Sequence, residues 1–321
     1  MAQGRPDKKP VDFLVTGGAG FLGSALANRL ARDGHTVRVI DDLSAGDPAR
    51  LGSAVLFTRG DVNDRPKLWT LLQGVECVYH LAARVSVPES ILYPREYTAV
   101  NVGGAVSVME AMRDAGVQRV VLVSSGAVYG EQATQPLREN LTPDPRSPYA
   151  VSKLAAEYYV RTIGTLWGIE TVALRVFNAY GPQQPLPAAH APVIPRFLRQ
   201  ALSGGSLITF GNGRQTRDYV YVDDVVEALA AAATVKTVDR QVINVGSGVE
   251  TSVSDLAALV SKVTGRPVEP ILNSNETGGV SRMRADLTLA KRKLNFRPRI
   301  GLAEGLRLVM ERDPRFSQAR A

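Results

Sequence analysis

Short apolar runs and longer amphipathic segments alternate along the first half of the chain. Runs of this length, bounded by glycine and polar residues, are typical of strands buried on both faces of a sheet. The strands predicted in this way span residues 11–16, 36–40, 54–58, 76–81, 119–124 and 171–176. Helices are predicted between most of them, at residues 21–32, 64–73, 96–115 and 149–167. This alternation predicts an α/β fold with a doubly wound parallel sheet.

The pattern becomes irregular after Phe177. A loop-like stretch rich in proline follows, and regular elements return only at residues 222–234, 241–245, 251–264 and 302–312. Such a punctuated region after a sheet domain is often a lobe that holds a ligand. The division we expect is a flexible tail at 1–10, a sheet domain at 11–176 to which about 218–245 returns, and a smaller C-terminal substrate-binding lobe at 177–217 and 246–315.

Composition fits one large domain with a smaller appendage. The chain has 321 residues, of which 45% are apolar and 21% charged, as in ordinary globular proteins. Residues 1–10 lack the apolar core of a secretory signal, and no run of about 18 apolar residues is present, so we expect no membrane span. Cys77 is the single cysteine, which excludes a disulfide framework and favours a cytoplasmic protein.

The chain is basic, with a net charge of +7 and a sequence pI near 9.6. Nucleic-acid-binding domains often show such a charge balance. Here the lysines and arginines are scattered and form no long run, so we expect no nucleic-acid partner. A solvated basic surface would help to attract an anionic small substrate.

Three glycines join the first predicted strand to the first predicted helix. In the stretch TGGAGFLG, Gly17 permits a tight turn, Gly20 lets a pyrophosphate approach the backbone, and Gly23 allows close packing of helix on strand. Phe21 and Leu22 open the helix, whose free N–H groups then face the phosphates. A glycine-rich turn without a ligand is the alternative. The position directly after the first strand favours a dinucleotide and a Rossmann-type fold.

Acidic residues follow the second and third predicted strands. Asp41 lies where a carboxylate holds the adenosine ribose of NAD, and it would repel the 2′-phosphate of NADP. Asp42 adds a second negative charge. Asp61 and Val62 are placed to meet the adenine edge. We therefore expect NAD to be the cofactor.

Tyr149 and Lys153 lie four residues apart at the start of a predicted helix. Positions i and i+4 share one helix face, so both side chains can point at one spot. Lys153 would then favour the phenolate and lower the pKa of Tyr149, which makes a general base usable near neutral pH. A pair of ordinary surface residues is the alternative.

Several further motifs occur in order along the chain. They are TGGAGFLG at 16–23, DDLSAG at 41–46, HLAA at 80–83, SSGAVYG at 124–130, YAVSK at 149–153, LRVFNAYGP at 174–182, RDYVYVDD at 217–224 and NVGSG at 244–248. With these motifs the chain resembles the extended short-chain dehydrogenases/reductases of the nucleotide-sugar epimerase/dehydratase family, over roughly residues 11 to 312.

The resemblance implies roles for the matching positions. Tyr149 would be the catalytic base, with Lys153 as the partner that also binds the nicotinamide ribose and Ser125 as the hydroxyl that hydrogen-bonds the reacting sugar oxygen. Positions that would line or adjoin the cofactor are Leu81, Ala82, Ala83 and Asn101. Positions that would contact the substrate are Ser86, Ser125, Asn178 and Arg217, the last two at the nucleotide diphosphate. For Arg217 the alternative is an ion pair with Asp218 or Asp223.

The residues after Ser125 bear on the chemistry. In this family NAD takes a hydride from the sugar C4, and the 4-keto intermediate is then reduced again, dehydrated or decarboxylated. Relatives that dehydrate or decarboxylate typically carry carboxylates just after this serine, whereas this chain has Gly126 and Ala127, which transfer no proton. We therefore expect C4 epimerisation, with UDP-glucose and UDP-galactose as the leading pair.

Two alternatives stay open. A hexose dehydratase or a decarboxylase could draw its acid and base groups from elsewhere, for instance from Glu131. A non-catalytic NAD-binding regulator is the other, although the complete set of Ser125, Tyr149 and Lys153 argues against it.

The C-terminal lobe departs from the family pattern at one place. Many relatives carry an Arg-Pro-Gly segment that contacts the diphosphate, where this chain has residues 275–279. Arg282, or else Arg284, would have to take over that contact.

The chain shows no metal-ligand spacing around its histidines, and His80 reads as a core residue, so we expect no metal. The resemblance also implies a homodimer through a four-helix bundle of the helices at about 96–115 and 149–167. The apolar face suited to that bundle or to an intramolecular core comprises Val100, Ala105, Val108, Met109 and Met112.

Overall fold

The computed structural model describes residues 10–273 and 279–317. The predicted tail, apart from Pro10, and residues 275–278 of the departing stretch lie outside the described residues. Within them, no helix is long and apolar enough to cross a bilayer.

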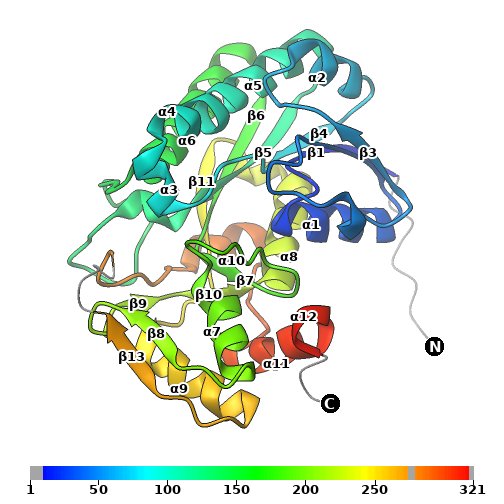
Figure 1. Cartoon of the computed structure of the whole chain (residues 1–321). Coiled ribbons are helices and arrows are strands. Elements are labelled where there is room, and N and C mark those ends of the chain that lie inside the picture. The colour runs from blue at the N-terminus through cyan, green and yellow to red at the C-terminus, as the bar shows by residue number, and fades with distance from the viewer. Residues whose placement is uncertain (1–9, 274–278, 318–321) are drawn as a thin grey trace.

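A parallel sheet forms the centre of the molecule (Figure 1). Within the described residues it has seven strands, in the order β11-β6-β5-β4-β1-β2-β3, and every neighbouring pair is parallel. The strands are β1 (Asp12–Thr16), β2 (Thr36–Asp41), β3 (Val55–Arg59), β4 (Cys77–His80), β5 (Arg119–Ser125), β6 (Glu170–Val176) and β11 (Gln241–Val245). All the strands predicted from the sequence are present, and the doubly wound fold is confirmed.

Helices cover the sheet on both faces because successive residues of the strands are apolar and point to opposite faces. Phe13 and Val15 of β1 belong to the core beneath α1 and α8, whereas Leu14 between them belongs to the core beneath α2, α5 and α6. The bounds of these helices are α1 (Phe21–Arg32), α2 (Arg65–Leu71), α5 (Gly104–Ala115), α6 (Pro148–Trp167) and α8 (Val222–Thr234).

The helix predicted at 96–115 is divided. It consists of α4 (Pro94–Tyr97), a π-helical segment η2 (Thr98–Gly103) and α5, and a short helix α3 (Val87–Leu92) precedes it. A π-helical turn holds an extra residue and often marks a functional site. On α5, the apolar face with Ala105 and Met109 is buried in the core of this chain.

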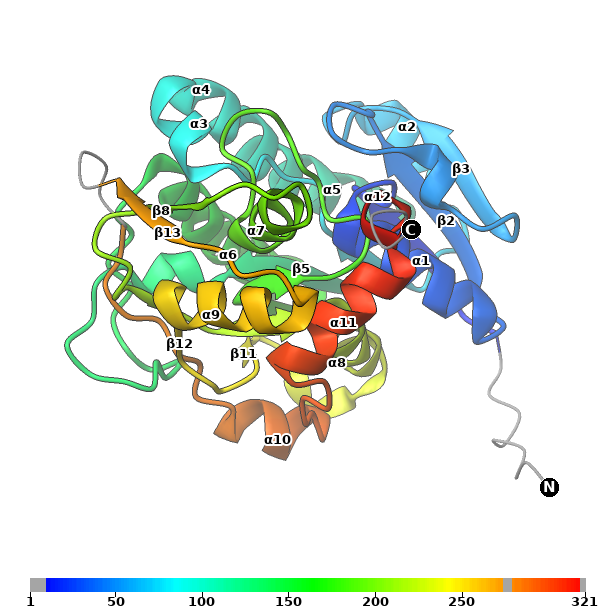
Figure 2. The same cartoon turned by 60° about the horizontal axis from the view of Figure 1, so that its bottom comes forward.

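Most of the remaining elements form a second lobe beside the C-terminal ends of the strands (Figures 1 and 2). Its helices are α7 (Val193–Leu202), α9 (Val253–Thr264), α10 (Thr288–Leu294), α11 (Leu302–Arg312) and α12 (Pro314–Ser317). Three separate two-stranded pairs also occur among the described residues: β7 (Asn178–Tyr180) with β10 (Tyr219–Tyr221), β9 (Thr216–Arg217) with β12 (Thr251–Ser252), and β8 (Leu207–Phe210) with β13 (Pro270–Asn273). Short 3₁₀ turns are η1 (Pro48–Arg50), η3 (Gly126–Tyr129) and η4 (Lys236–Val238).

The direction of chain winding reverses between β1 and β4, which are neighbours in the sheet. In open α/β sheets the loops at such a switch point diverge and leave a crevice outside the carboxyl ends of the strands. The glycine loop follows β1, and the loop from Leu81 follows β4. The fold therefore places the two segments beside each other.

Candidate active site

The glycine loop after β1 is built by close backbone contacts. The amide of Gly17 donates to the carbonyl of Ile40 (2.8 Å), and Gly17 has a positive φ of 67°. A Cβ at Gly17 would lie 2.7 Å from backbone atoms of Ala82, and one at Gly23 would lie 2.1 Å from the carbonyl oxygen of Gly17. Side chains at these positions would therefore separate the loop from the helix and from the strand beside it.

The N-terminus of α1 has no side-chain cap. Gly20 occupies the N-cap position, where no side-chain oxygen accepts from the first amides of the helix. These amides, which include those of Phe21 and Leu22, belong to the unsatisfied donors of a helix start. The loop thus offers the donors and the space that a dinucleotide pyrophosphate requires.

A hydrogen-bonded junction fixes the two loops at the switch point. The hydroxyl of Thr16 bonds Nδ1 of His80 (2.8 Å) and accepts from the amide of Ala82 (3.2 Å). Burial, with the charge of Lys153 nearby, lowers the pKa of His80 to about 3, so the imidazole is neutral. His80 is therefore a hydrogen-bonded core residue, as its sequence context indicated.

Asp41 ties the glycine loop to the loop after β2. Its buried carboxylate accepts from the amides of Ala19 (3.0 Å) and Leu43 (2.9 Å). Burial raises the pKa of Asp41, and these two hydrogen bonds oppose the shift. The side chain lies at the end of β2, where the sequence predicted a contact with the adenosine ribose.

The other predicted adenosine residues differ in exposure. Asp42 and Asp61 are exposed, and each accepts a hydrogen bond from an amide two residues further on. Val62 is buried and packs against Gly104 at the start of α5. The structure thus leaves the two carboxylates exposed and buries Val62 in the hydrophobic core.

Asn101 in the π-helical segment holds the loop after β4. Its side-chain oxygen accepts from the amide of Arg84 (2.8 Å), and its Nδ2 donates to the carbonyl of Arg84 (3.0 Å) and to the hydroxyl of Ser152 (2.9 Å). This buried amide therefore joins the loop that carries Leu81, Ala82 and Ala83 to α6. The sequence placed Asn101 near the cofactor but did not predict this bridging role.

The predicted catalytic residues come together at the ends of β5 and α6. Ser125 is the last residue of β5, and its hydroxyl lies against the phenol of Tyr149 and favours the phenolate. Tyr149 and Lys153 lie in the first turns of α6, which begins at Pro148 and is capped by Ser147. The ring of Tyr97 packs edge-on against that of Tyr149, with 6.5 Å between centroids.

The electrostatics of this group differ from the prediction. Burial raises the pKa of Tyr149, with the Ser125 hydrogen bond opposing it, and Lys153 does not lower it as we predicted. Burial also lowers the pKa of Lys153 to about 8. Both residues lie in the first turns of one helix, but the loss of water around the phenol outweighs the Ser125 hydrogen bond.

Ser86 follows the loop after β4, and Asn178 follows β6. Ser86 caps α3, since its hydroxyl accepts from the amide of Glu89 (3.3 Å). The side chain of Asn178 is exposed at the start of β7. The backbone N–H of Asn178 donates to the carbonyl of Asp218 (3.0 Å). Asn178 is thus adjacent to the β9–β10 segment that carries Arg217.

Arg217 is largely buried, which lowers its pKa. Its Nη1 donates to the carbonyls of Thr216 (2.7 Å) and Val280 (2.8 Å). The carboxylates named as alternative ion-pair partners are engaged elsewhere. That of Asp218 accepts from Ser247, Gly248 and Ala285, and that of Asp223 pairs with Arg312.

Arg282 is engaged with a carboxylate of its own lobe. Its Nε and Nη2 donate to Glu250 at 2.7 Å each, and this hydrogen bonding lowers the pKa of Glu250 to about 2. A diphosphate at Arg282 would therefore have to compete with Glu250.

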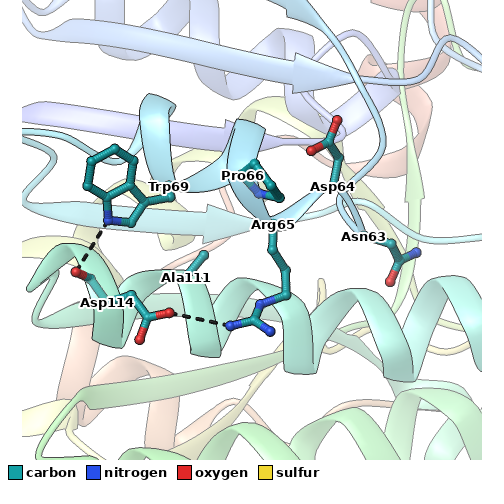
Figure 3. Close-up of a pocket in the computed structure, with 7 residues that line it drawn as sticks. All are labelled: Asn63, Asp64, Arg65, Pro66, Trp69, Ala111 and Asp114. Carbon is teal, nitrogen blue, oxygen red and sulfur yellow. Dashed lines mark hydrogen bonds and ion pairs between the residues drawn. The ribbon is translucent and has the colours of Figure 1, made fainter.

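A hollow of about 490 Å³ lies outside the crevice, between α2 and α5 (Figure 3). Arg65 within it pairs with Asp114 (3.4 Å) and Glu110 (3.2 Å), and the indole of Trp69 donates to the carbonyl of Asp114 (3.4 Å). The charge of Arg65 is balanced by these two carboxylates, and none of the predicted catalytic residues lines the hollow. We therefore do not assign the hollow to the candidate active site. No cluster of metal-ligating side chains occurs among residues 10–273 and 279–317.

One buried group beside the site was missed by the sequence analysis. Glu157 lies one turn beyond Lys153 on α6 and accepts from Ser124, the neighbour of Ser125, and from Arg175 on β6. The signal was present, because a carboxylate on the inward face of a helix four residues after a buried lysine needs a partner.

Comparison with known proteins identifies the family. Residues 13–246 match the model of the family described as "NAD dependent epimerase/dehydratase family". The chain belongs to this family. It is an NAD-dependent enzyme, in keeping with the glycine loop and with Asp41.

The enzyme has similar relatives along its whole length. A UDP-glucose 4-epimerase of Mycolicibacterium smegmatis is 40% identical over 305 residues, which cover 93% of this chain and 97% of that protein. The solved structure of a UDP-glucose 4-epimerase of Thermotoga maritima, with UDP-glucose, has a TM-score of 0.91 at 35% identity and covers 97% of this chain and 100% of its own.

A UDP-glucuronic acid 4-epimerase of Bacillus cereus, in complex with UDP-glucuronic acid and NAD, is also similar. Its TM-score is 0.86 at 30% identity, covering 97% of this chain and 99% of that one. Similar proteins thus act on more than one sugar.

The glycine loop generates a first test. In Gly23→Ala the new methyl group would meet the carbonyl of Gly17, so we expect loss of bound NAD and destabilisation by about 3 kcal/mol. NAD released on denaturation and the melting temperature measure the two effects. Gly301→Ala is the control, because Gly301 has open space around its Cβ position. Normal NAD content in Gly23→Ala would contradict the account of the loop.

Proposed function

We propose that the enzyme is a C4 epimerase of a UDP-sugar, with UDP-glucose and UDP-galactose as its substrate pair. The observation that supports this most is the group of Ser125, Tyr149 and Lys153 beside the glycine loop, followed by a segment without acid or base side chains. A Cβ at Gly126 would lie 3.2 Å from the ring of Phe177. Packing thus leaves little room there for the carboxylate of a dehydratase.

In this proposal Tyr149 handles a single proton. Bound NAD would supply the hydride acceptor, and its positive charge would act together with the Ser125 hydrogen bond to favour the phenolate of Tyr149. The phenolate of Tyr149 removes the proton of the sugar 4-hydroxyl while Ser125 hydrogen-bonds the same oxygen. After the 4-keto sugar has turned over in the pocket, the hydride would return to the other face of C4 while Tyr149 returns the proton to the oxygen there. The protein ends in the state in which it began.

Asn178 and Arg217 support a nucleoside diphosphate. A guanidinium pairs well with phosphate oxygens, and Arg217 is held in place by two backbone carbonyls. We place Asn178 and Arg217 in the substrate lobe of residues 177–217 and 246–315. We place Ser86 in a loop that faces this lobe. The relatives that act on UDP-sugars favour uridine as the base.

The hydrogen bonds of Glu131 argue against a dehydratase or decarboxylase that would use this residue as its acid. Its carboxylate accepts from the amide of Ser281 (2.8 Å) and from the Ser281 hydroxyl. These hydrogen bonds lower the pKa of Glu131, which makes it a poor proton donor. The regulator alternative is disfavoured by the intact proton-handling group.

Product analysis tests the reaction. With UDP-galactose we expect UDP-glucose at unchanged mass, identified by NMR. Tyr149→Phe removes the base, so kcat should fall by about a thousandfold or more. Tyr158→Phe is the matched control, because Tyr158 lies on the same helix with its ring exposed. Loss of water or of carbon dioxide from the product would contradict the proposal, as would full activity in Tyr149→Phe.

The pH dependence tests the role of Lys153. Since burial lowers its pKa to about 8, the charged form disappears as the pH rises through that value. In the NAD-loaded enzyme, where Ser125 and the charge of the cofactor hold Tyr149 as the phenolate, we expect kcat/KM to fall on the alkaline side with an apparent pKa near 8, about tenfold for each further pH unit. In Lys153→Arg the positive charge persists at high pH, so kcat/KM of the residual activity should not fall on the alkaline side. A wild-type profile that stays flat to pH 10 would contradict the assignment.

The structure also supports the homodimer that we propose. The stripe on α6 formed by Val151, Tyr158, Tyr159 and Leu166 is at least half exposed. Its spacing suits a helix of a second copy. Light scattering after gel filtration should give the wild type twice the chain mass of 34.5 kDa. The double variant Tyr158→Glu/Leu166→Glu should have the mass of one chain. Leu56→Glu, on β3, is the exposed apolar control. A monomeric wild type would contradict the dimer.

A further inference from the structure

A buried ion pair lies one helical turn below the catalytic lysine. Glu157 on α6 is 2% exposed and Arg175 on β6 is 4% exposed. The pair is bidentate, with Nε to Oε1 at 3.0 Å and Nη2 to Oε2 at 2.8 Å. The hydroxyl of Ser124 donates to the same Oε1. Glu157 therefore connects three segments: α6, β6 and the end of β5.

An aromatic ring packs on the arginine side of the pair. The guanidinium of Arg175 lies 4.7 Å from the ring centroid of Tyr129, whose hydroxyl donates to Asn244 (2.7 Å). Removing two charges from water is expensive, and an apolar pair of similar volume often stabilises a fold equally well or better. Stability alone is therefore a weak explanation for this pair.

The location of Glu157 offers a better explanation for the buried ion pair. Through Ser124 it holds the strand residue that precedes Ser125, and along α6 it lies on the same inward face as Lys153 and Tyr149. We propose that Glu157 is a positioning residue, which holds the Ser125 hydroxyl in register with Tyr149 through Ser124 and places a negative charge one helical turn from the Lys153 ammonium. This inference rests on the roles of these residues in the proposed function.

Few charges face Lys153 from the elements around it. His80, from β4, is neutral. Tyr149 and Glu157 come from α6, and Ser125 comes from β5. Arg175, from β6, points its guanidinium at Glu157. Burial lowers the pKa of Lys153, and the charge of Glu157 is what opposes this shift. Without that charge the pKa of Lys153 would fall further below its ordinary value.

The test uses Glu157→Gln in the full-length, NAD-loaded enzyme. The pKa of Lys153 is read directly from the ¹³Cε resonance of labelled lysine without any sugar, with Lys153→Arg to assign the signal. We expect the midpoint to move down by about one pH unit from the wild-type value near 8. With UDP-galactose, the alkaline limb of kcat/KM should move by the same amount, while kcat at pH 6.5 falls less than at pH 8.5 and KM changes little.

Three further variants keep the proposal falsifiable if Glu157→Gln folds poorly. Glu157→Gln/Arg175→Gln removes both charges, so no unpaired arginine is left buried, and it should keep the lowered midpoint. Glu157→Asp retains the charge and should restore most of the wild-type midpoint. Asp224→Asn is the control, because Asp224 is also buried and accepts from two amides but belongs to α8 and holds residues 299 and 300.

Each outcome decides a separate point. If the Lys153 resonance titrates at the same pH in wild type and in both Gln variants, the inference is overturned and Glu157 is structural only. It is equally overturned if Asp224→Asn shifts the limb as far as Glu157→Gln does. If the resonance shifts as expected but UDP-galactose is not converted by wild type, the proposed substrate is wrong while the role of Glu157 stands.

Discussion

The close approach of backbone segments at the β1/β4 switch point is the constraint on which the rest of the structure depends. Gly17 touches the backbone of Ala82, and Gly23 touches that of Gly17, at distances that leave no room for side chains. Thr16 then bonds both His80 and Ala82. Because these contacts fix the loops after β1 and β4 together, a cofactor held by the first loop lies against the second.

Helix α6 brings the residues to which we assign the proton chemistry beside this junction. It begins at Pro148 under the Ser147 cap, so Tyr149 lies at the edge of the site and Lys153 one turn deeper. The same periodicity brings Glu157 beneath Lys153, where Ser124 and Arg175 hold it. One helix face thus carries the phenol, the ammonium and the carboxylate, and the end of β5 supplies Ser125.

The sequence predicted the strands of the sheet, the glycine turn after β1 and the shared helix face of Tyr149 and Lys153 because these depend on local signals. Gly17 and Gly23 follow an apolar run, and Tyr149 and Lys153 share a helix face. Contacts between distant segments were not predictable: the pairing of Arg282 with Glu250, the bridge from Asn101 to Ser152, and the pairing of Glu157 with Arg175. The pKa direction of Tyr149 was wrong for the same reason, since burial is a property of the assembled fold.

The central claim is that one sugar carbon is oxidised and reduced again while Tyr149 takes up one proton and returns it. UDP-galactose carrying deuterium at C4 tests this most directly, when it is converted in ordinary water and the product is examined by NMR and mass spectrometry. The account predicts UDP-glucose with its deuterium still at C4 and no exchange at C3 or C5. Loss of the C4 deuterium to solvent, or exchange at C5, would contradict it.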